Sequence, residues 1–388
     1  MLINILIGGQ IMNNMTSKEL VYAAIEGRKL ENYPVTAPYN YLSMNDHWEK
    51  ITGLPYWKYY EWLITSPEKH GEMYETLYEK WPFDIFNAGD FCKDEEERKN
   101  MEVVSKNGNY YYHFIKEDRY EILNRNIHES HEANATEQKI FTKQDVCEKV
   151  LVEKAEVAIA KGKMDFTRQA VDKLGDEKFG LLGCVINTFY SCSWHFGLTN
   201  MFAMLYEEPE LFEYLSEKIL EQNIERIRAL ASTGGDAIWI DDATATNDMI
   251  SPAMYERFSL PYLTQQVKEI QRLGKKAVLI YFGGISDRIE QIASTGADVL
   301  MMETSMKGFV NDYDTIAKQL NGRMCLTGNL NPYDDIEITS EDALSKVIKK
   351  QVESGRRYGK YITSTGSPLT PNSSVDRIRK YIDLAHSM

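Results

Sequence analysis

Short apolar segments alternate with amphipathic segments along the second half of the chain. Residues 237–240 and 299–302 are apolar at successive positions, which is typical of strands buried on both faces of a parallel sheet. The segments between such runs carry apolar residues at helical spacing. Strands that alternate with helices predict a parallel α/β architecture.

An internal repeat supports this prediction. Residues 224–242 read IERIRALASTGGDAIWIDD, and residues 285–304 read ISDRIEQIASTGADVLMMET. Each copy is an amphipathic helix, a Ser-Thr-Gly turn and an apolar strand that ends in an acidic residue. Gly234 and Gly296 stand just after the helix, where the backbone commonly needs a positive φ. We therefore expect each copy to form one helix–strand unit.

The same rhythm predicts a set of strands that together suggest a barrel. The expected strands are residues 34–37, 83–87, 181–187, 237–240, 276–282, 299–302, 323–327 and 361–365. Eight strands with helices between them favour a (β/α)8 TIM barrel. We expect residues 15–388 to form one such barrel domain and treat residues 1–14 as uninformative.

Two further segments lie outside this rhythm. Thr16-Ser17-Lys18-Glu19 reads as a capping box that opens a helix to about residue 28, and residues 44–80 are expected to be helical, so the barrel carries an N-terminal helical extension. Residues 93–148 are the most polar region. We expect them to be an insertion with a hairpin around residues 110–114 and loops near His128 and Asn134.

Net charge, hydropathy and cysteine content limit the classes of partner and the cellular location that we expect for this chain. The 58 acidic and 44 basic residues give a net charge of −14, which disfavours nucleic acid and anionic membrane surfaces as partners. No apolar run approaches the ~20 residues of a membrane span. The five cysteines are widely spread without a CxxC motif, so we expect no disulfide framework and a reducing, cytoplasmic location.

In a barrel of this kind the chemistry lies at the carboxyl ends of the strands. Asp241 and Glu303 occupy equivalent positions of the repeat. Carboxylates at one mouth can perform acid–base chemistry or hold a metal, whereas an Asp after a strand is also a common helix N-cap, and the sequence leaves these roles open. The residues expected at the mouth are Asp84, Asn87, Asn187, Tyr190, Asp241, Asp242, Tyr281, Phe282, Glu303, Asn329 and Ser367.

Two histidine-containing segments are weaker candidates. Trp194 and His195 follow the third strand, and we expect His195 to line the pocket rather than to pair with Cys192, because neighbouring positions seldom face each other. His128 and His131 have ligand-like spacing, but their polar surroundings favour a solvated surface. No Walker A, GxGxxG or HExxH motif occurs, so ATP, NAD and zincin chemistry lose their main support.

Several segments together resemble the uroporphyrinogen decarboxylase superfamily. MTSKELVYAAIEGRKLENYPV resembles its first helix and strand, FAMLYEEPELFEYLSEKI its helix after strand 3, and DDATATNDMISPAMYERFSLPYL its strand-4 loop and following helix. RMCLTGNLNP is close to its Gly-Asn-Leu-Asp-Pro signature, with Asn331 in place of the Asp. The resemblance covers nearly the whole chain from residue 15 and implies a (β/α)8 barrel with decarboxylase or corrinoid-linked methyltransferase activity.

Departures from the superfamily patterns select among its activities. The decarboxylases carry an Arg-rich motif after strand 1 that binds the substrate carboxylates. This chain reads APYNYL at residues 37–42, without an Arg. A porphyrinogen with many carboxylates would therefore lack its cationic partners here. The coenzyme M methyltransferases bind zinc through a His-x-Cys pair and a later Cys. Ile280, Phe282 and Ser367 stand at those positions, so zinc held by thiolates is unsupported, and zinc stays open only through oxygen ligands such as Asp242 and Glu303.

The resemblance then implies a substrate:corrinoid methyltransferase similar to the first component of anaerobic O-demethylases. It would move a methyl group from a small methylated compound, such as a methoxyarene, to a corrinoid on a separate protein. Asp241, Asp242 or Glu303 would be general acid or metal ligand; Tyr281 and Asn329 would orient the substrate, with Phe282 and Trp194 as apolar wall. The alternatives are a decarboxylase or lyase acting on a smaller carboxylate and a non-catalytic binding barrel. Such barrels often form homodimers.

Overall fold

The computed structural model describes residues 15–89, 92–123, 142–306 and 308–388. Within them, a seven-stranded parallel sheet runs through the centre of the molecule, with neighbours in the order β1, β5, β6, β7, β8, β9 and β10. Its strands are β1 (Ile85–Ala88), β5 (Phe179–Ile186), β6 (Ala237–Asp242), β7 (Lys276–Tyr281), β8 (Val299–Met302), β9 (Cys325–Thr327) and β10 (Tyr361–Ile362).

The segment around Val35 closes this sheet into a barrel. Val35 forms a parallel bridge with Thr363, just after β10. On its other side, the Asp84 amide, just before β1, donates to the Val35 carbonyl at 3.0 Å. Residue 35 therefore stands where an eighth strand would lie, between the last strand and the first. The expected (β/α)8 architecture is confirmed, with its first strand reduced to a single bridge.

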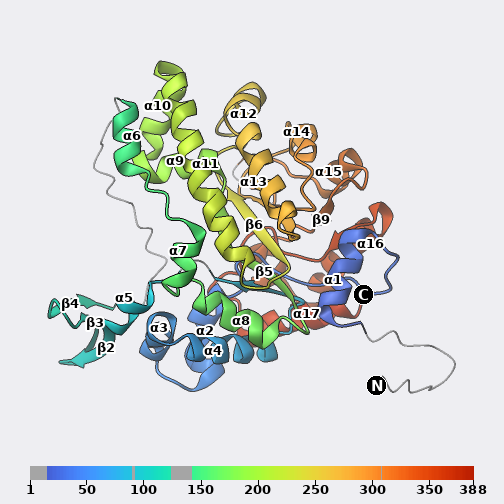
Figure 1. Cartoon of the computed structure of the whole chain (residues 1–388). Helices are drawn as coiled ribbons and strands as arrows, with labels where there is room; N and C mark the ends of the chain where they lie inside the picture. Colours follow the sequence, from blue (N-terminus) through green and yellow to red (C-terminus); the bar gives the residue numbers. More distant parts are fainter. Residues whose placement is uncertain (1–14, 90–91, 124–141, 307) are drawn as a thin grey trace.

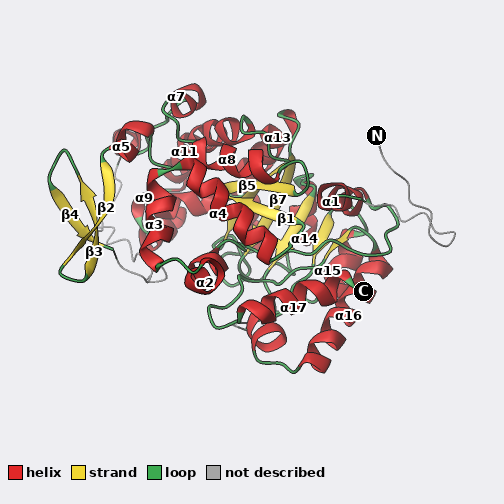
Figure 2. Ribbon diagram, turned by 90° about the horizontal axis from the view of Figure 1, so that it is seen from below, coloured by secondary structure: helices red, strands yellow, loops and turns green. Residues whose placement is uncertain are grey.

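Helices surround the barrel on its outer side, as Figure 2 shows. Their order reflects the βα rhythm of the sequence. The helices are α1 (Ser17–Glu26), α2 (Leu42–Thr52), α3 (Tyr56–Thr65), α4 (Pro67–Lys80), α5 (Glu95–Lys99), α6 (Lys143–Lys149), α7 (Ala155–Ala160), α8 (Asp165–Leu174), α9 (Thr188–Phe196), α10 (Leu198–Glu207), α11 (Pro209–Ala231), α12 (Pro252–Phe258), α13 (Leu260–Arg272), α14 (Ile289–Ser294), α15 (Tyr313–Leu320), η1 (Pro332–Glu337), α16 (Glu341–Tyr358) and α17 (Val375–His386).

Local sequence signals account for several helix boundaries. Thr16 and Glu19 form the predicted capping box at the start of α1, and α2 to α4 fill the region expected to be helical. Gly234 and Gly296, the repeat glycines, have φ values of 101° and 75°. Only glycine adopts this region without strain, so the turn between helix and strand follows directly from the sequence.

The insertion forms a small antiparallel sheet that projects from one side of the molecule (Figure 1). Its strands are β2 (Met101–Lys106), β3 (Asn109–Phe114) and β4 (Arg119–Ile122). The predicted hairpin is confirmed, and β4 adds a strand to it. His128, His131 and Asn134 lie outside the described residues. Of the helices that are described, none is both long and apolar enough to cross a membrane.

Candidate active site

Asp241 lies at the carboxyl end of β6 and faces the barrel interior. Side chains alternate along a strand, so Asp241 shares its side with Trp239. The ring of Tyr39 packs against Trp239, with the centroids 4.9 Å apart, and against Phe282, at 5.9 Å. The Tyr39 hydroxyl donates a hydrogen bond to Oδ2 of Asp241. An acid and a phenol are thus joined within an aromatic wall at the mouth of the barrel.

Glu303 follows β8 and lies on the other side of β7 from Asp241. Its carboxylate accepts a hydrogen bond of 3.4 Å from the Ser367 hydroxyl, and the side chain is buried. Two amides hold its backbone carbonyl: Nδ2 of Asn311 at 3.0 Å and Nδ2 of Asn329 at 3.5 Å. Asn329 therefore acts on the position of Glu303. The predicted pair of repeat carboxylates is placed at one end of the barrel, about two strand spacings (~10 Å) apart.

Asp242 points to the opposite side of the sheet, toward the helices. Its Oδ1 accepts from the amides of Thr244 and Ala245, both at 2.7 Å, and its Oδ2 accepts from Nδ2 of Asn187 at 2.5 Å. Burial raises the pKa of Asp242, and these hydrogen bonds oppose the rise. Asp242 secures the turn after β6. The expectation that it acts at the mouth is wrong because neighbouring strand residues face opposite sides.

Tyr281 and Asn187 belong to the same outer side as Asp242. Tyr281 is paired with Asp242 in the β6–β7 register, and its hydroxyl shares a 2.8 Å hydrogen bond with that of Tyr255 on α12. Asn187 is the N-cap of α9 and donates to Ser259 at 3.0 Å as well as to Asp242. The roles predicted for both residues at the substrate are therefore corrected: they join strands to helices.

Asp84 lies at the wrong end of the barrel for the role predicted for it. It precedes β1 rather than following it, and so lies at the amino end of the strand. Its carboxylate accepts from the Ser17 hydroxyl at 2.5 Å and the Val35 amide at 2.7 Å, and it pairs with Nε2 of His386 at 2.8 Å. Asp84 thus joins the start of α1 and the end of α17 to the amino end of β1. Asn87, inside β1, accepts from the Asn40 amide at 3.1 Å.

The three candidate site residues on α9, which are Tyr190, Trp194 and His195, lie in different surroundings. Tyr190 and Trp194 meet edge to face, and the Trp194 side chain is 65% exposed. His195 hydrogen-bonds Gln222 of α11 and lies near Lys149 of α6. Burial lowers the pKa of His195. His195 therefore contacts neighbouring helices, and its place in the substrate pocket stays a prediction.

The side chains do not fit a thiolate zinc site. Ile280, Phe282 and Ser367, which occupy the positions discussed above, offer an aliphatic group, a phenyl ring and a hydroxyl. Across the described ranges, no group of three or more His, Cys, Asp and Glu side chains is arranged to hold a metal ion. Asp242 and Glu303 cannot act together as ligands because Asp242 faces the outer side of the sheet.

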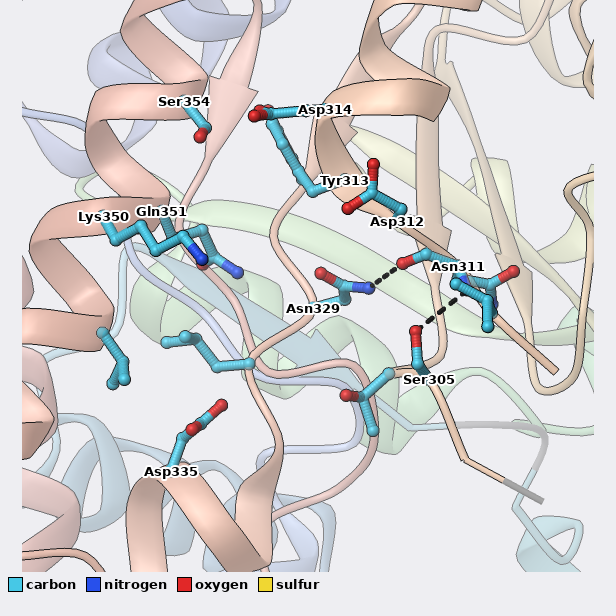
Figure 3. A pocket seen from close by; sticks show the side chains of 14 residues that line it. Ser305, Asn311, Asp312, Tyr313, Asp314, Asn329, Asp335, Lys350, Gln351 and Ser354 are labelled. Carbon is cyan, nitrogen blue, oxygen red and sulfur yellow. Dashed lines mark hydrogen bonds between the residues drawn. The ribbon is translucent and has the colours of Figure 1, made fainter. Parts of the chain in front are cut away.

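Two cavities adjoin the barrel end, and neither was predicted. One, of about 370 Å³, lies between α15 and α16 and includes Asn329, whose Nδ2 donates to the Asn311 carbonyl at 2.9 Å (Figure 3). The other, of about 350 Å³, lies beside α2 and α4 and includes Tyr41. Tyr39 was also missed. It follows the first predicted strand, so applying the strand-end rule to that strand would have found it.

Comparisons with known proteins show which family and which solved structure this chain is similar to. A family model described as "Uroporphyrinogen decarboxylase (URO-D)" matches residues 128–388. Uroporphyrinogen decarboxylases of Coxiella burnetii and Xanthomonas campestris are 25% and 26% identical over 186 and 195 residues. These alignments cover 47% and 48% of this chain, and it spans about half the length of these relatives, 48% and 52%. A solved methyltransferase from Methanosarcina mazei has a TM-score of 0.66 at 15% identity, covering 96% of this chain and 99% of its own.

Proposed function

The chain belongs to the uroporphyrinogen decarboxylase family, and on that basis we propose that it moves a methyl group from a small methylated compound to a corrinoid carried by a separate protein. The observation that carries the proposal is the acid–phenol pair of Asp241 and Tyr39 within an aromatic wall. The methyltransferase similar in fold along nearly its whole length supports it.

The charge of the mouth favours this reaction over decarboxylation of a porphyrinogen. A substrate with many carboxylates requires cationic partners for them. Five side chains meet at the mouth through the contacts given above: Tyr39, Asp241, Phe282, Glu303 and Ser367. Two of these five are acids and none is a Lys, an Arg or a His. Such a mouth suits a neutral or cationic methyl donor.

The proposed reaction needs a proton at the departing atom. The reduced corrinoid supplies the nucleophile, whose electron pair forms the new bond to the methyl carbon. The pair of the breaking bond between methyl and heteroatom stays on the heteroatom. An oxygen or thiolate leaving group then takes up one proton, whereas a quaternary amine leaves as a neutral amine without one. The Tyr39 hydroxyl donates to Oδ2 of Asp241, so Asp241 acting as the general acid would give its proton from its other oxygen, Oδ1. The rings of Trp239 and Phe282 border this acid with apolar surface, which would limit the access of water.

The test is spectrophotometric. The purified protein is mixed with cob(I)alamin and, separately, with methoxyarenes, methylamines, betaines or methyl thiols, and formation of methylcob(III)alamin is followed. We expect a signal that depends on one donor class and is lost in Asp241→Asn. Absence of signal with every donor, while a known methyltransferase responds in the same assay, contradicts the proposal.

Decarboxylation of a smaller carboxylate is the second candidate. The family match and the curated relatives favour it, since both carry the decarboxylase name. Its mark is release of carbon dioxide from a candidate acid without any corrinoid. That result, together with a silent methyl-transfer assay, would replace the first proposal by the second.

A further inference from the structure

Tyr39 has a backbone conformation that is uncommon for an aromatic residue. Its φ is 48°, in the left-handed region, which costs free energy for a residue with a Cβ. Within the described ranges, the other non-glycine residues with positive φ are Asn107, Asp118, Asn321 and Lys360, and all of these but Lys360 are types that tolerate this region. Strain of this kind persists only where the surroundings fix it, and it is concentrated at functional sites.

The next residue, Asn40, is fixed to β1 by its backbone and by its side chain. It is 1% exposed. Its backbone amide donates to Oδ1 of Asn87 at 3.1 Å, and its Nδ2 donates to the Ile85 carbonyl at 3.0 Å. Its Oδ1 accepts from the Tyr78 hydroxyl. Both ends of the Asn40 side-chain amide are therefore bonded, one to the strand and one to α4.

Two tyrosines of α4 support this anchor from outside the barrel. The Asn87 amide donates to the Tyr78 hydroxyl at 2.9 Å, and the Asn87 carbonyl accepts from the Tyr74 hydroxyl at 2.8 Å. Burial raises the pKa of both phenols, so both keep their protons at pH 7. The hydrogen bonds thus join α4, the carboxyl end of β1 and Asn40 into one buried network.

Tyr39 leaves this anchored turn toward a different strand. The sheet places β5 between β1 and β6, and the Tyr39 hydroxyl donates to Asp241 at the end of β6. Its ring packs on Trp239 of the same strand. Asn40 and Tyr39 are neighbours in the chain, so a movement of the anchor changes the direction of the phenol.

We propose that Asn40 is a positioning residue. By fixing the turn to β1, it holds Tyr39 in its left-handed conformation and keeps the phenol on Asp241 before any substrate binds. The free energy spent on the backbone of Tyr39 is thus used to preorganise the acid–phenol pair. The effect of Asn40 on turnover rests on the proposed function, whereas its effect on the placement of Tyr39 does not.

The first experiment observes Tyr39 directly, without substrate or corrinoid. The protein is produced with 3-fluorotyrosine, and the fluorine NMR resonance that is lost in Tyr39→Phe is assigned to Tyr39. We expect Asn40→Ala to shift or broaden this resonance, because the turn loses its side-chain bonds to Ile85 and Tyr78.

Asn223→Ala is the matched control. Asn223 on α11 is 3% exposed, and its Nδ2 donates to the Ile186 carbonyl at 3.0 Å, so the exchange removes a comparable buried hydrogen bond on the outer side of the sheet. It should leave the Tyr39 resonance unchanged. A change as large as that in Asn40→Ala overturns the inference, because general loosening would then explain both.

Tyr78→Phe is a milder variant of the same anchor. It keeps the ring but removes the hydroxyl that bonds Oδ1 of Asn40 and the Asn87 amide, and it should also shift the Tyr39 resonance. Circular dichroism and the melting temperature establish which variants are folded. Asn40→Ala decides the question where it folds, and Tyr78→Phe decides it where Asn40→Ala does not. An unchanged Tyr39 resonance in the deciding variant overturns the inference.

The second experiment measures turnover in a double-mutant cycle. Asn40→Ala should lower the rate of methyl transfer by about 10-fold, as Tyr39→Phe does, because both weaken one hydrogen bond to the acid. The double variant should lie within about 2-fold of Tyr39→Phe alone, since Asn40 acts through the Tyr39 hydroxyl. Losses that multiply to about 100-fold overturn the positioning role.

Failure of this inference and failure of the proposed function give different results. A Tyr39 resonance that responds to Asn40→Ala, with no methyl transfer from any donor, leaves the positioning of Tyr39 standing and removes the methyltransferase proposal. Methyl transfer in the unchanged protein, with a Tyr39 resonance that ignores the anchor, removes the positioning role and leaves the methyltransferase proposal.

Discussion

The last two residues of β6 are both aspartates, and they lie in two different environments. Asp241 is on the inner side of the barrel, where a phenol bonds it and aromatic rings border it. Asp242 is on the outer side, where its carboxylate accepts from two backbone amides and one side-chain amide. The inner acid, Asp241, is hydrogen-bonded to the Tyr39 hydroxyl at the mouth. The outer acid, Asp242, stabilises the turn after β6 through its hydrogen bonds.

The same contrast recurs on β7. Phe282 is on the inner side, against Tyr39, whereas Tyr281 is bonded to Tyr255 of the helical layer. Residue type alone does not separate the two roles, since each side of the rim holds an acid and an aromatic ring. What separates them is the strand pleat, which sends neighbouring side chains to opposite faces. The following predictions test whether inner residues carry activity and outer residues carry stability.

Asp241→Asn should have the largest effect. The amide keeps the shape of the carboxyl but cannot supply a proton, so we expect turnover to fall by about 10²–10⁴-fold, as for removal of a general acid. The melting temperature should change little. The measurement is the rate of methyl transfer in the spectrophotometric assay, beside a thermal melt. A variant that keeps full turnover would remove Asp241 from the mechanism.

Asp242→Ala should chiefly destabilise the fold. The change leaves the amides of Thr244 and Ala245 and Nδ2 of Asn187 without their acceptor in a buried place. We expect a loss of about 3 kcal/mol in the free energy of unfolding, measured by urea denaturation. The rate per folded molecule should stay within a few-fold of the unchanged protein. A selective loss of turnover would place Asp242 in the chemistry and break the comparison.

Tyr39→Phe should have an intermediate effect on the inner side. It removes the hydroxyl that donates to Asp241 but keeps the ring that packs on Trp239 and Phe282. One hydrogen bond of about 1.4 kcal/mol to the acid corresponds to ~10-fold in rate. Unchanged turnover in Tyr39→Phe would show that the bond has no part in the reaction.

The sequence predicted most of the fold, and it predicted Asp241 and Glu303 at one end of the barrel, for a physical reason. Strand positions follow from runs of apolar residues, and the turn glycines Gly234 and Gly296 follow from their φ requirement, so both are local properties. Asp84 was misplaced because the strand-end rule was applied to a residue at the amino end of the expected strand, 83–87, and β1 begins just after it, at Ile85. The pairing of Asp241 with Tyr39, 202 residues apart, depends on barrel closure.

Tyr281→Phe should give a small effect confined to the outer side. It removes the hydroxyl that shares a hydrogen bond with Tyr255, and burial raises the pKa of both phenols, so neither is ionised at neutral pH. We expect a loss of about 1 kcal/mol in stability and no change in turnover. Tyr255→Phe is the matched control and should give a similar loss, while the double variant should cost less than the sum.

The pH dependence of stability in Asp242→Asn offers the finest test of the outer environment. Burial raises the folded-state pKa of Asp242, so the folded protein holds that proton more tightly than the unfolded chain does. The stability linked to this proton is present below the ordinary Asp pKa of about 3.8 and is lost as pH rises through the raised value. The amide introduced by the substitution does not ionise, so the variant should gain stability relative to the unchanged protein across that window. Urea denaturation of both proteins at a series of pH values measures the difference. A slope of opposite sign would show that the hydrogen bonds to the carboxylate outweigh its burial, and that the outer acid is held as an anion.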